Sequence, residues 1–330
     1  MLRYILRRII MVIPVVLGVI LIVFMFQAFS RDDPVDEILG AGATEEDRTA
    51  LRIAMGLNDP IIIQYARYVW EFVSKGNLGT SYYSRQPVMG ELLRRYPITM
   101  RLAFTSISLA ALIGIPLGVI SAVKQYTMVD SSILAVTVFI LAMPNFWLAL
   151  LLISLFAVTL RWLPAVGLAN PLGWIMPTIV AMITPMGNCT RTTRSSMLES
   201  IRQDYIRTVR AKGMSEFTVV IRHALRNSLI PILAQIGNSL GIQLGGSLIV
   251  ESIFGLPGIG KYAIDAISAR NLPSVRGSVV LLAITFTVVN TILDLIIMMI
   301  DPRVKTALLF SGKKKKSAQV LKKEVAETDG

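Results

Sequence analysis

The chain has 330 residues, of which 54% are hydrophobic and only 16% are charged. Soluble domains carry about a quarter charged residues, so this composition indicates a membrane protein and excludes a disordered or collagen-like chain. The 33 basic and 21 acidic residues give a net charge of +12. These basic residues flank long apolar runs, where membrane topology explains them without a nucleic acid partner. A single cysteine, Cys189, excludes an internal disulfide framework.

Six apolar segments are candidates for transmembrane helices, because about 20 apolar residues cross the roughly 30 Å hydrocarbon core of a bilayer. We therefore predict an all-α, polytopic membrane protein with six transmembrane helices. The first lies in segment 1–29 and contains 21 uncharged residues, which favours a retained anchor over a cleavable signal peptide with its core of about 7–15 residues. The other five are expected at about 102–123, 131–157, 174–190, 227–250 and 277–300.

Basic residues predict the orientation of these spans. Three arginines precede the first span, a basic segment 191–226 follows the fourth, and a lysine-rich tail follows the sixth. An even number of spans places all three on one side, which the positive-inside rule makes cytoplasmic, so both termini are expected inside. The segment 30–100 is then an extracytoplasmic insertion, 101–310 is the transmembrane domain, and 311–330 is predicted to be a disordered basic and acidic cytoplasmic tail.

The string GLPGIGK, at Gly255 to Lys261, has the glycine and lysine spacing of a phosphate-binding P-loop. Tyr262 stands where that loop needs a serine or threonine hydroxyl, and the predicted topology places the string outside, away from cytoplasmic ATP. We therefore interpret it as a turn-rich outer loop. No set of histidine, cysteine and carboxylate residues has metal-ligand spacing. The sequence thus predicts neither a metal site nor a catalytic site, and the chain is not expected to be an enzyme.

The segment from Asp204 to Pro231 shows helical periodicity inside a predicted cytoplasmic loop. Ile206 and Val209 share one face of a first amphipathic helix, and a second can begin after Gly213 with Ser215 as its N-cap. Two amphipathic helices hinged at a glycine form a docking element. Their apolar faces could insert into a groove of a partner protein or lie on anionic lipid, and the residues alone favour neither.

The fifth predicted span combines small and polar residues. Its glycines recur every four residues, a pattern typical of close helix packing: Gly237, Gly241 and Gly245. Polar groups at membrane depth usually face protein or a water-filled cavity, so the polar residues of this span and one after Pro144 are candidates for lining a translocation path. They are Asn145, Gln235, Asn238, Ser239 and Gln243.

Several strings in the sequence carry a family resemblance. YIRTVRAKG, HALRNSLIP and ESIFGLPGIGKYAIDAI resemble the membrane subunits of ATP-binding-cassette importers of the dipeptide/oligopeptide permease family. The opening LRYILRR, the string TRSSMLE and the late DPR extend the resemblance over nearly the whole chain. The general importer motif has Glu-Ala-Ala before its glycine, whereas this chain has Arg207-Thr208-Val209 before Gly213, and that departure resembles the peptide-type branch.

The resemblance implies a permease subunit that forms half of a translocation path. It also implies four kinds of partner: a homologous second permease, two ATP-binding cassette ATPase subunits that bind ATP and Mg²⁺, an extracytoplasmic solute-binding protein, and the lipid bilayer of a bacterial or archaeal cytoplasmic membrane. In that family the loop between the fourth and fifth spans docks on the ATPase. The residues that would form this coupling element are Tyr205, Arg207, Arg210, Ala211, Lys212, Gly213, Met214 and Ser215.

The substrate is the least determined part of this interpretation. Peptides are the commonest implication of the resemblance, and related permeases are associated with nickel chelates, glutathione and oligosaccharides. A secondary transporter working alone is the rival from another class. It would favour paired ionisable residues near the membrane midplane and an internal repeat, and the sequence shows one intramembrane acid and no obvious repeat.

Overall fold

The computed structural model describes residues 2–29, 34–40, 42–167 and 170–300. In these residues the chain is helical, with one isolated β-bridge between Thr80 and Pro87, so the predicted all-α class is confirmed. The helices are α1 (Leu2–Phe29), α2 (Pro34–Leu39), α3 (Glu45–Ala54), α4 (Ile61–Lys75), α5 (Val88–Val123), α6 (Met128–Ala142), α7 (Asn145–Leu152), the π-helix η1 (Ile153–Thr159), the 3₁₀-helix η2 (Pro171–Trp174), α8 (Ile175–Ile201), α9 (Asp204–Ala211), α10 (Glu216–Thr218), the π-helix η3 (Val219–Leu225), α11 (Arg226–Gly246), α12 (Leu248–Ile253), α13 (Ile259–Ser268) and α14 (Leu272–Ile300).

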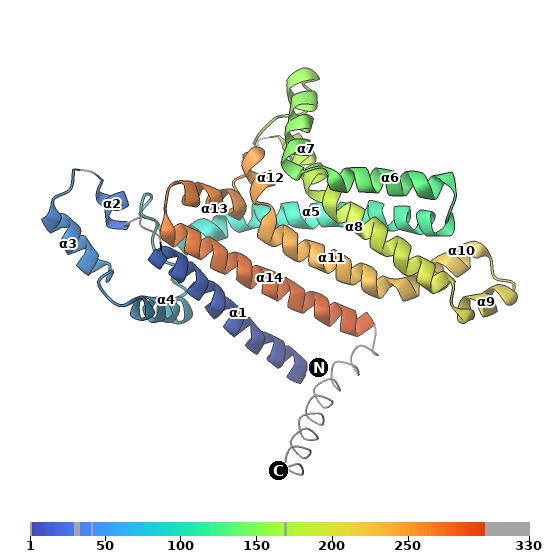
Figure 1. Cartoon of the computed structure of the whole chain (residues 1–330), viewed down its shortest axis with the longest axis horizontal. Coiled ribbons are helices and arrows are strands. Elements are labelled where there is room, and N and C mark those ends of the chain that lie inside the picture. The colour runs from blue at the N-terminus through green and yellow to red at the C-terminus, as the bar shows by residue number, and fades with distance from the viewer. Residues whose placement is uncertain (1, 30–33, 41, 168–169, 301–330) are drawn as a thin grey trace, which may run out of the picture.

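The long helices lie side by side in one elongated bundle (Figure 1). Helices α9 and α10 lie at one end of this bundle, and α12 and α13 lie toward the other. The short helices α2 and α3 extend beyond the end of α1, and α4 lies across that end rather than along the bundle. The insertion with α2–α4 and the turn with α9 and α10 therefore lie at opposite ends of the bundle, and α7 stands out from its side.

Three helical segments of the described chain are long and apolar enough to cross a membrane: Val88–Val123, Pro171–Ile201 and Leu272–Met299. A fourth candidate is the pair formed by α6 with α7 and η1, and the apolar helix Ile10–Phe26 is shorter. These helices bear out a membrane protein. The count of six spans and the placement of both termini inside stay predictions.

The segment 131–157, expected as one span, is sharply bent. Helix α6 ends before Pro144 and α7 begins after it, with an angle of 95° between the two parts. Proline lacks an N–H, and its ring disfavours the helical conformation of the preceding residue. Met143 accordingly adopts an extended conformation with a ψ of 126°. The break therefore follows directly from the sequence, although its angle does not.

Helices α5 and α8 approach closely through two glycines of α5. A Cβ added at Gly114 would lie 2.8 Å from the carbonyl oxygen of Met186, and one at Gly118 would lie 2.7 Å from that of Thr190. Real Cβ contacts of this length essentially do not occur, so any side chain there would push the two helices apart. This glycine pair sets the spacing at the centre of the bundle.

The glycines of α11 divide into two groups. A Cβ at Gly237 would lie 2.8 Å from Leu293 Cδ1, and one at Gly241 would lie 2.8 Å from Phe286 Cε2, so both positions face α14 at close range. Gly245 has no atom within 4 Å of such a Cβ. Within the described chain, Gly237 and Gly241 thus lie at close helix contacts and Gly245 does not.

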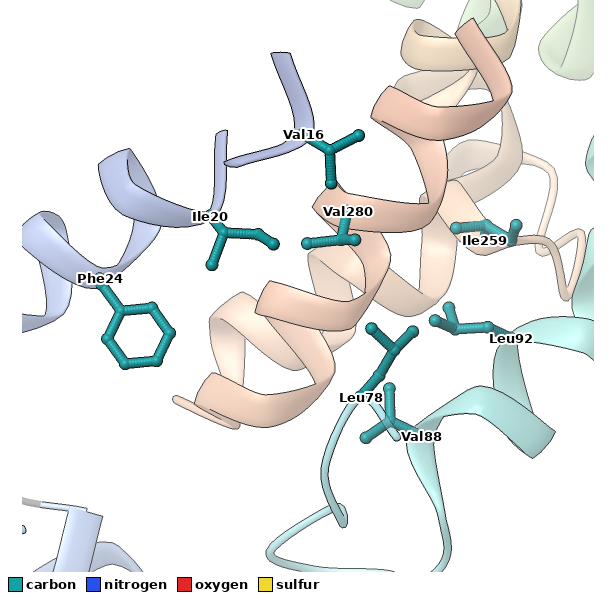
Figure 2. Packing of buried hydrophobic residues seen from close by; sticks show 8 residues of the cluster. All are labelled: Val16, Ile20, Phe24, Leu78, Val88, Leu92, Ile259 and Val280. Atoms are coloured by element: carbon teal, nitrogen blue, oxygen red, sulfur yellow. The ribbon is translucent and has the colours of Figure 1, made fainter. Parts of the chain in front are cut away.

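A buried apolar cluster fastens the segment between α1 and α5 to the bundle (Figure 2). Val16, Ile20 and Phe24 of α1 pack toward Val280 of α14, and these meet side chains from the start of α5 and from α13. The remaining members of the cluster are Leu78, Val88, Leu92 and Ile259. The insertion is therefore anchored on α1, α5 and α14 together.

Candidate functional site

The predicted coupling element lies at the end of the bundle that carries α9. Helix α9 follows α8 after two residues, and its Ile206 is fully buried while Val209 is half-buried. Ile206 belongs to a cluster with Met197 of α8 and Val220 of η3, and Val209 packs against that cluster. The expectation that this apolar face would be free for a partner or for lipid is therefore wrong, because the chain's own helices cover it.

The surface that α9 leaves free is polar. We call residues 205–215 the coupling segment. All eight residues predicted for coupling lie on it with exposed side chains or, for Gly213, an exposed backbone: Tyr205, Arg207, Arg210, Ala211, Lys212, Gly213, Met214 and Ser215. Phe217, two residues further on, is 77% exposed and adds an aromatic ring to the same turn. The local periodicity of the sequence does not show whether this ring is covered by another part of the chain.

The turn in the coupling segment depends on backbone conformation. Gly213 has a φ of +77°, in the left-handed region that only glycine adopts without strain, and no atom lies within 4 Å of where a Cβ would be. Its N–H donates to the carbonyl oxygen of Arg210 at 2.9 Å. Arg210 Nε also donates to Glu216 Oε1 at 2.6 Å, so one ion pair closes the turn.

The chain that follows the coupling segment differs from the expected separate helix. Helical structure runs without a break from Glu216 through η3 into α11, and α8 continues to Ile201. Only residues 202–215 therefore separate α8 from the next long helical run, with α9 inside them. Ser215 occupies the predicted N-cap position, although its hydroxyl bonds to Thr218 Oγ1 at 2.9 Å rather than to a backbone N–H. The helices themselves reach beyond the expected span ends.

Polar contacts tie the base of the coupling segment to the bundle. Ser200 of α8 and Ser228 of α11 share a hydrogen bond of 2.8 Å, and both are buried. Arg194 of α8 forms a bidentate ion pair with the buried Asp130 of α6, with both nitrogen–oxygen distances at 2.8 Å. Ser121 at the end of α5 donates to the same carboxylate at 2.5 Å. These contacts join the end of α8, from which the coupling segment continues, to α5, α6 and α11.

The five predicted path-lining residues do not converge on one cavity. Gln243 Nε2 donates to Ser106 Oγ at 3.0 Å and to the carbonyl oxygen of Ala181 at 2.7 Å, which joins α11 to α5 and α8. Asn145 Oδ1 accepts from Thr184 Oγ1 at 3.2 Å, and the exposed Asn238 lies on α11. These contacts give Gln243 and Asn145 roles in helix packing.

Gln235 lies beside a polar cavity. Its Nε2 donates to the buried Ser239 Oγ at 3.2 Å. The cavity, of about 490 Å³, lies between α6, α8 and α11. It is lined by Leu134, Asn188, Arg191, Thr192, Arg194, Ser195 and Gln235. Among the predicted lining residues, Gln235 is the one that borders it, and the α8 residues were not identified from the sequence.

The glycine loop, residues 255–261 at the opposite end, encloses a carboxylate of its own chain. Glu251 of α12 is fully buried, and its Oε1 accepts from Thr99 Oγ1 at 2.8 Å while its Oε2 accepts from the Lys261 N–H at 3.1 Å. A Cβ at Gly258 would overlap Oε2, and one at Gly260 would lie 2.8 Å from it. The N–H groups at the N-terminus of α13 thus hold the carboxyl group of Glu251.

The environment of Glu251 opposes its ionisation. Burial raises the pKa of this carboxyl above its usual range, and the hydrogen bonds from Thr99 and from the N–H groups of Lys261 and Gly260 act in the opposite direction. Thr99 also accepts from the Ile259 N–H at 2.9 Å, so the same threonine joins α5 to α13. The spacing in the sequence that resembles a phosphate loop therefore serves an internal contact between α5, α12 and α13.

The fold and these two ends define a helical membrane protein with an exposed polar turn tied to its central helices. The family model for the binding-protein-dependent transport system inner membrane component matches residues 114–306, and the N-terminal model of such membrane components matches residues 1–103. The chain belongs to this family. It is therefore a transport subunit of the inner membrane, as the resemblance in its sequence indicates.

Relatives cover nearly the whole chain. It is 37% identical over 309 residues to a putative peptide transport system permease protein of Brucella abortus (strain 2308). The match covers 91% of this chain and 98% of that protein. It is 36% identical to the dipeptide transport system permease protein DppB of Alkalihalophilus pseudofirmus, with 92% of this chain and 100% of that protein covered. It is 35% identical to the glutathione transport system permease protein GsiC of Salmonella paratyphi A, with 92% and 99% covered.

A solved structure shares the fold. A chain from inward-facing conformations of the MetNI methionine ABC transporter matches with a TM-score of 0.53 and 19% sequence identity. The match covers 64% of this chain and 97% of the other. The part of this chain outside the match is therefore additional to the shared fold.

Proposed function

We propose that this chain is the permease subunit of an ATP-driven importer for dipeptides or oligopeptides, and that it forms half of the translocation path. The observation that carries the proposal is the coupling segment, whose predicted contact residues are all exposed on a turn held by α8. Membership of the transport family and relatives named for peptide and dipeptide transport support it. Glutathione is itself a tripeptide, so a relative named for glutathione transport favours it as the second candidate substrate.

The proposed topology has six spans with both termini in the cytoplasm of a bacterial or archaeal cell. The coupling segment then faces the cytoplasm, and the α2–α4 insertion and the glycine loop face outward. The basic segments at 1–8, 191–226 and after Ile300 support this orientation. The lysine-rich tail that contributes to this argument lies outside the described residues.

The proposed partners are two ATPase subunits, a homologous second permease and an extracytoplasmic solute-binding protein. ATP and Mg²⁺ bind to the ATPases, and the coupling segment contacts them. ATP drives transport only through a difference in affinity between two states of the complex. Ile206 of α9 packs on α8, and α8 is joined to α6 by the Arg194–Asp130 ion pair and to α11 by the Ser200–Ser228 hydrogen bond. These contacts would move the path-forming helices as one unit.

Co-purification and transport test the proposal together. A tagged chain is purified from its native membrane in mild detergent, co-eluting proteins are identified by mass spectrometry, and the complex is reconstituted into liposomes. We expect ATPases and a second permease to co-elute, and labelled dipeptide or glutathione uptake to require ATP. Uptake by the chain alone without ATP would instead support a secondary transporter. If uptake requires ATP but the complex carries nickel chelates or oligosaccharides and neither peptide nor glutathione, the chain is an importer subunit and the proposed substrate is wrong.

A further inference from the structure

Helix α4 of the insertion has three distinct faces. One face packs against α1, and its members are Tyr65, Tyr68, Val69 and Phe72. A second face is polar, and its members are Gln64, Arg67, Glu71, Ser74 and Lys75. The third face is apolar and exposed, and its members are Ile62, Ile63, Ala66, Trp70 and Val73. A helix with two apolar faces and one polar face needs a second apolar neighbour besides α1.

The contact with α1 fixes the position of α4. The Tyr65 hydroxyl donates to the carbonyl oxygen of Leu17 at 3.2 Å. The ring centroid of Phe24 lies 5.9 Å from that of Tyr65 and 5.5 Å from that of Tyr68. Helix α4 therefore lies beside the second half of α1, not beyond its end.

Arg276 indicates where the contact between α1 and α4 lies relative to the membrane. Its guanidinium carbon lies 4.6 Å from the Phe24 ring centroid and 5.2 Å from that of Tyr68. Arg276 immediately precedes the uncharged segment that begins at Gly277, where the sixth span is expected to start. A charged residue at the edge of a span indicates the border between hydrocarbon and head groups. In the proposed topology α4 thus lies at the outer border of the membrane.

The exposed apolar face is pronounced. Ile62 is 66% exposed, Trp70 71% and Val73 72%. The neighbouring part of α1 also leaves apolar side chains uncovered, with Phe26 74% exposed and Ile22 54% exposed. The two exposed surfaces belong to helices that pack on each other. In the proposed topology α1 is a transmembrane helix, and such a helix exposes apolar side chains of this kind to lipid.

We propose that α4 is an interfacial helix whose face of Ile62, Ile63, Ala66, Trp70 and Val73 lies in the outer leaflet of the bilayer. This inference rests on the proposed topology and is independent of the cargo. Tryptophan concentrates at head-group level, and interfacial helices bury an apolar face about 5–10 Å deep while their charged face stays in water. Arg67, Glu71 and Lys75 occupy such a charged face. A membrane-bound α4 would hold the outer ends of α1 and α14 at a fixed depth.

Nitroxide scanning tests this assignment in the full chain. The single cysteine, Cys189, is buried, so Cys189→Ser provides a background for one spin label at a time. Labels replace Ile62, Trp70 and Val73 on the exposed apolar face, with Glu71 and Lys75 on the polar face as matched controls. The chain is placed in nanodiscs of phosphatidylethanolamine and phosphatidylglycerol. Collision rates with apolar oxygen and with a water-soluble nickel chelate are then compared at each position.

We expect oxygen to relax the labels at 62, 70 and 73 more than the nickel chelate does, and the order to reverse at 71 and 75. Equal access of the nickel chelate to both faces would overturn the proposal. The scan is repeated on the chain with its co-purified proteins. If the exposed apolar face is water-accessible in the chain alone and shielded from both reagents in the complex, a protein covers it and the lipid assignment is wrong. Neither result depends on transport.

Discussion

Two glycine-containing turns at opposite ends of the bundle use glycine for different physical reasons. In the coupling segment, Gly213 has a φ of +77° and open space around it, so glycine is required there for backbone conformation. In the glycine loop, Gly258 and Gly260 lie against the Glu251 carboxylate, so glycine is required there for room. An added side chain would strain the backbone at Gly213, whereas at Gly258 and Gly260 it would overlap a neighbouring group.

The difference matches the tasks proposed for the two ends. The coupling segment exposes charged groups on a turn closed by one surface ion pair, which leaves the segment free to contact a partner. The glycine loop instead joins α5, α12 and α13 around one buried carboxylate, which fixes those helices relative to each other. Substitutions in the coupling segment should therefore affect coupling, and substitutions in the glycine loop should affect folding.

Gly213→Val carries the largest expected effect. A β-branched residue at a φ of +77° strains the turn, and the left-handed conformation costs roughly 1–2 kcal/mol for an L-residue, or about tenfold in the population of the correct turn. We expect ATP-dependent uptake by the reconstituted complex to fall about tenfold or more. The amount of inserted chain and its elution in size-exclusion chromatography should stay unchanged, because no neighbouring atom is displaced.

Gly213→Asn is the matched control for that experiment, because asparagine tolerates the left-handed region better than valine does. Uptake should rank from glycine through asparagine to valine. Equal uptake by all three would show that the conformation of this turn is not required for coupling. If the valine variant fails to insert into the membrane, Gly213 is required for folding, and the different roles assigned to the two glycine turns are wrong.

Gly258→Ala should destabilise the folded chain itself. The added Cβ overlaps the buried Glu251 carboxylate, and overpacking of this kind typically costs about 1–3 kcal/mol. We expect a lower thermal unfolding midpoint in detergent and less inserted protein. Gly90→Ala is the matched control, since Gly90 lies in α5 with open space around it and should tolerate alanine. An unchanged midpoint for Gly258→Ala would mean that the glycine loop does not hold Glu251 as the structure indicates.

The sequence predicted much of the coupling end and little of the opposite end. The position of Gly213 followed from a local break in helical periodicity, and a local backbone conformation is what periodicity reports. The contact of Glu251 with Thr99 joins residues 152 positions apart, so no local pattern contains it. The sequence led us to interpret the glycines that suggested a phosphate loop as an outer turn, and the carboxylate that they enclose came from the fold.

The apolar face of α9 shows a second reason why the sequence predicts the site only in part. Periodicity placed Ile206 on an apolar side of α9, but it could not say whether a partner or the chain itself covers that side. The answer depends on Met197 and Val220, which come from other elements of the chain. Likewise, segment 131–157 was expected as one span although it contains Pro144, and the 95° bend at that proline came from the fold.

The pH dependence of stability should distinguish the enclosed carboxylate from an exposed one. Burial raises the pKa of Glu251 in the folded chain above its ordinary value of 4.5. The folded state therefore favours the protonated acid, and stability falls as the pH rises from the unfolded pKa through the folded pKa. We expect the unfolding midpoint of the native chain to fall relative to that of Glu251→Gln over this pH window. Parallel curves for the two proteins would contradict a raised pKa.

The ion pair that closes the coupling turn should have the smallest effect on stability. The Arg210 side chain is 39% exposed and that of Glu216 is 65% exposed, and an exposed pair of this kind contributes about 0.2–1 kcal/mol. A double-mutant cycle of Arg210→Ala and Glu216→Ala, followed by unfolding midpoints in detergent, measures that coupling energy. If Arg210 also contacts a partner, uptake should fall further in Arg210→Ala than in Glu216→Ala, although both remove the same ion pair. Equal uptake in the two single variants would limit Arg210 to shaping the turn and leave the contact to its exposed neighbours.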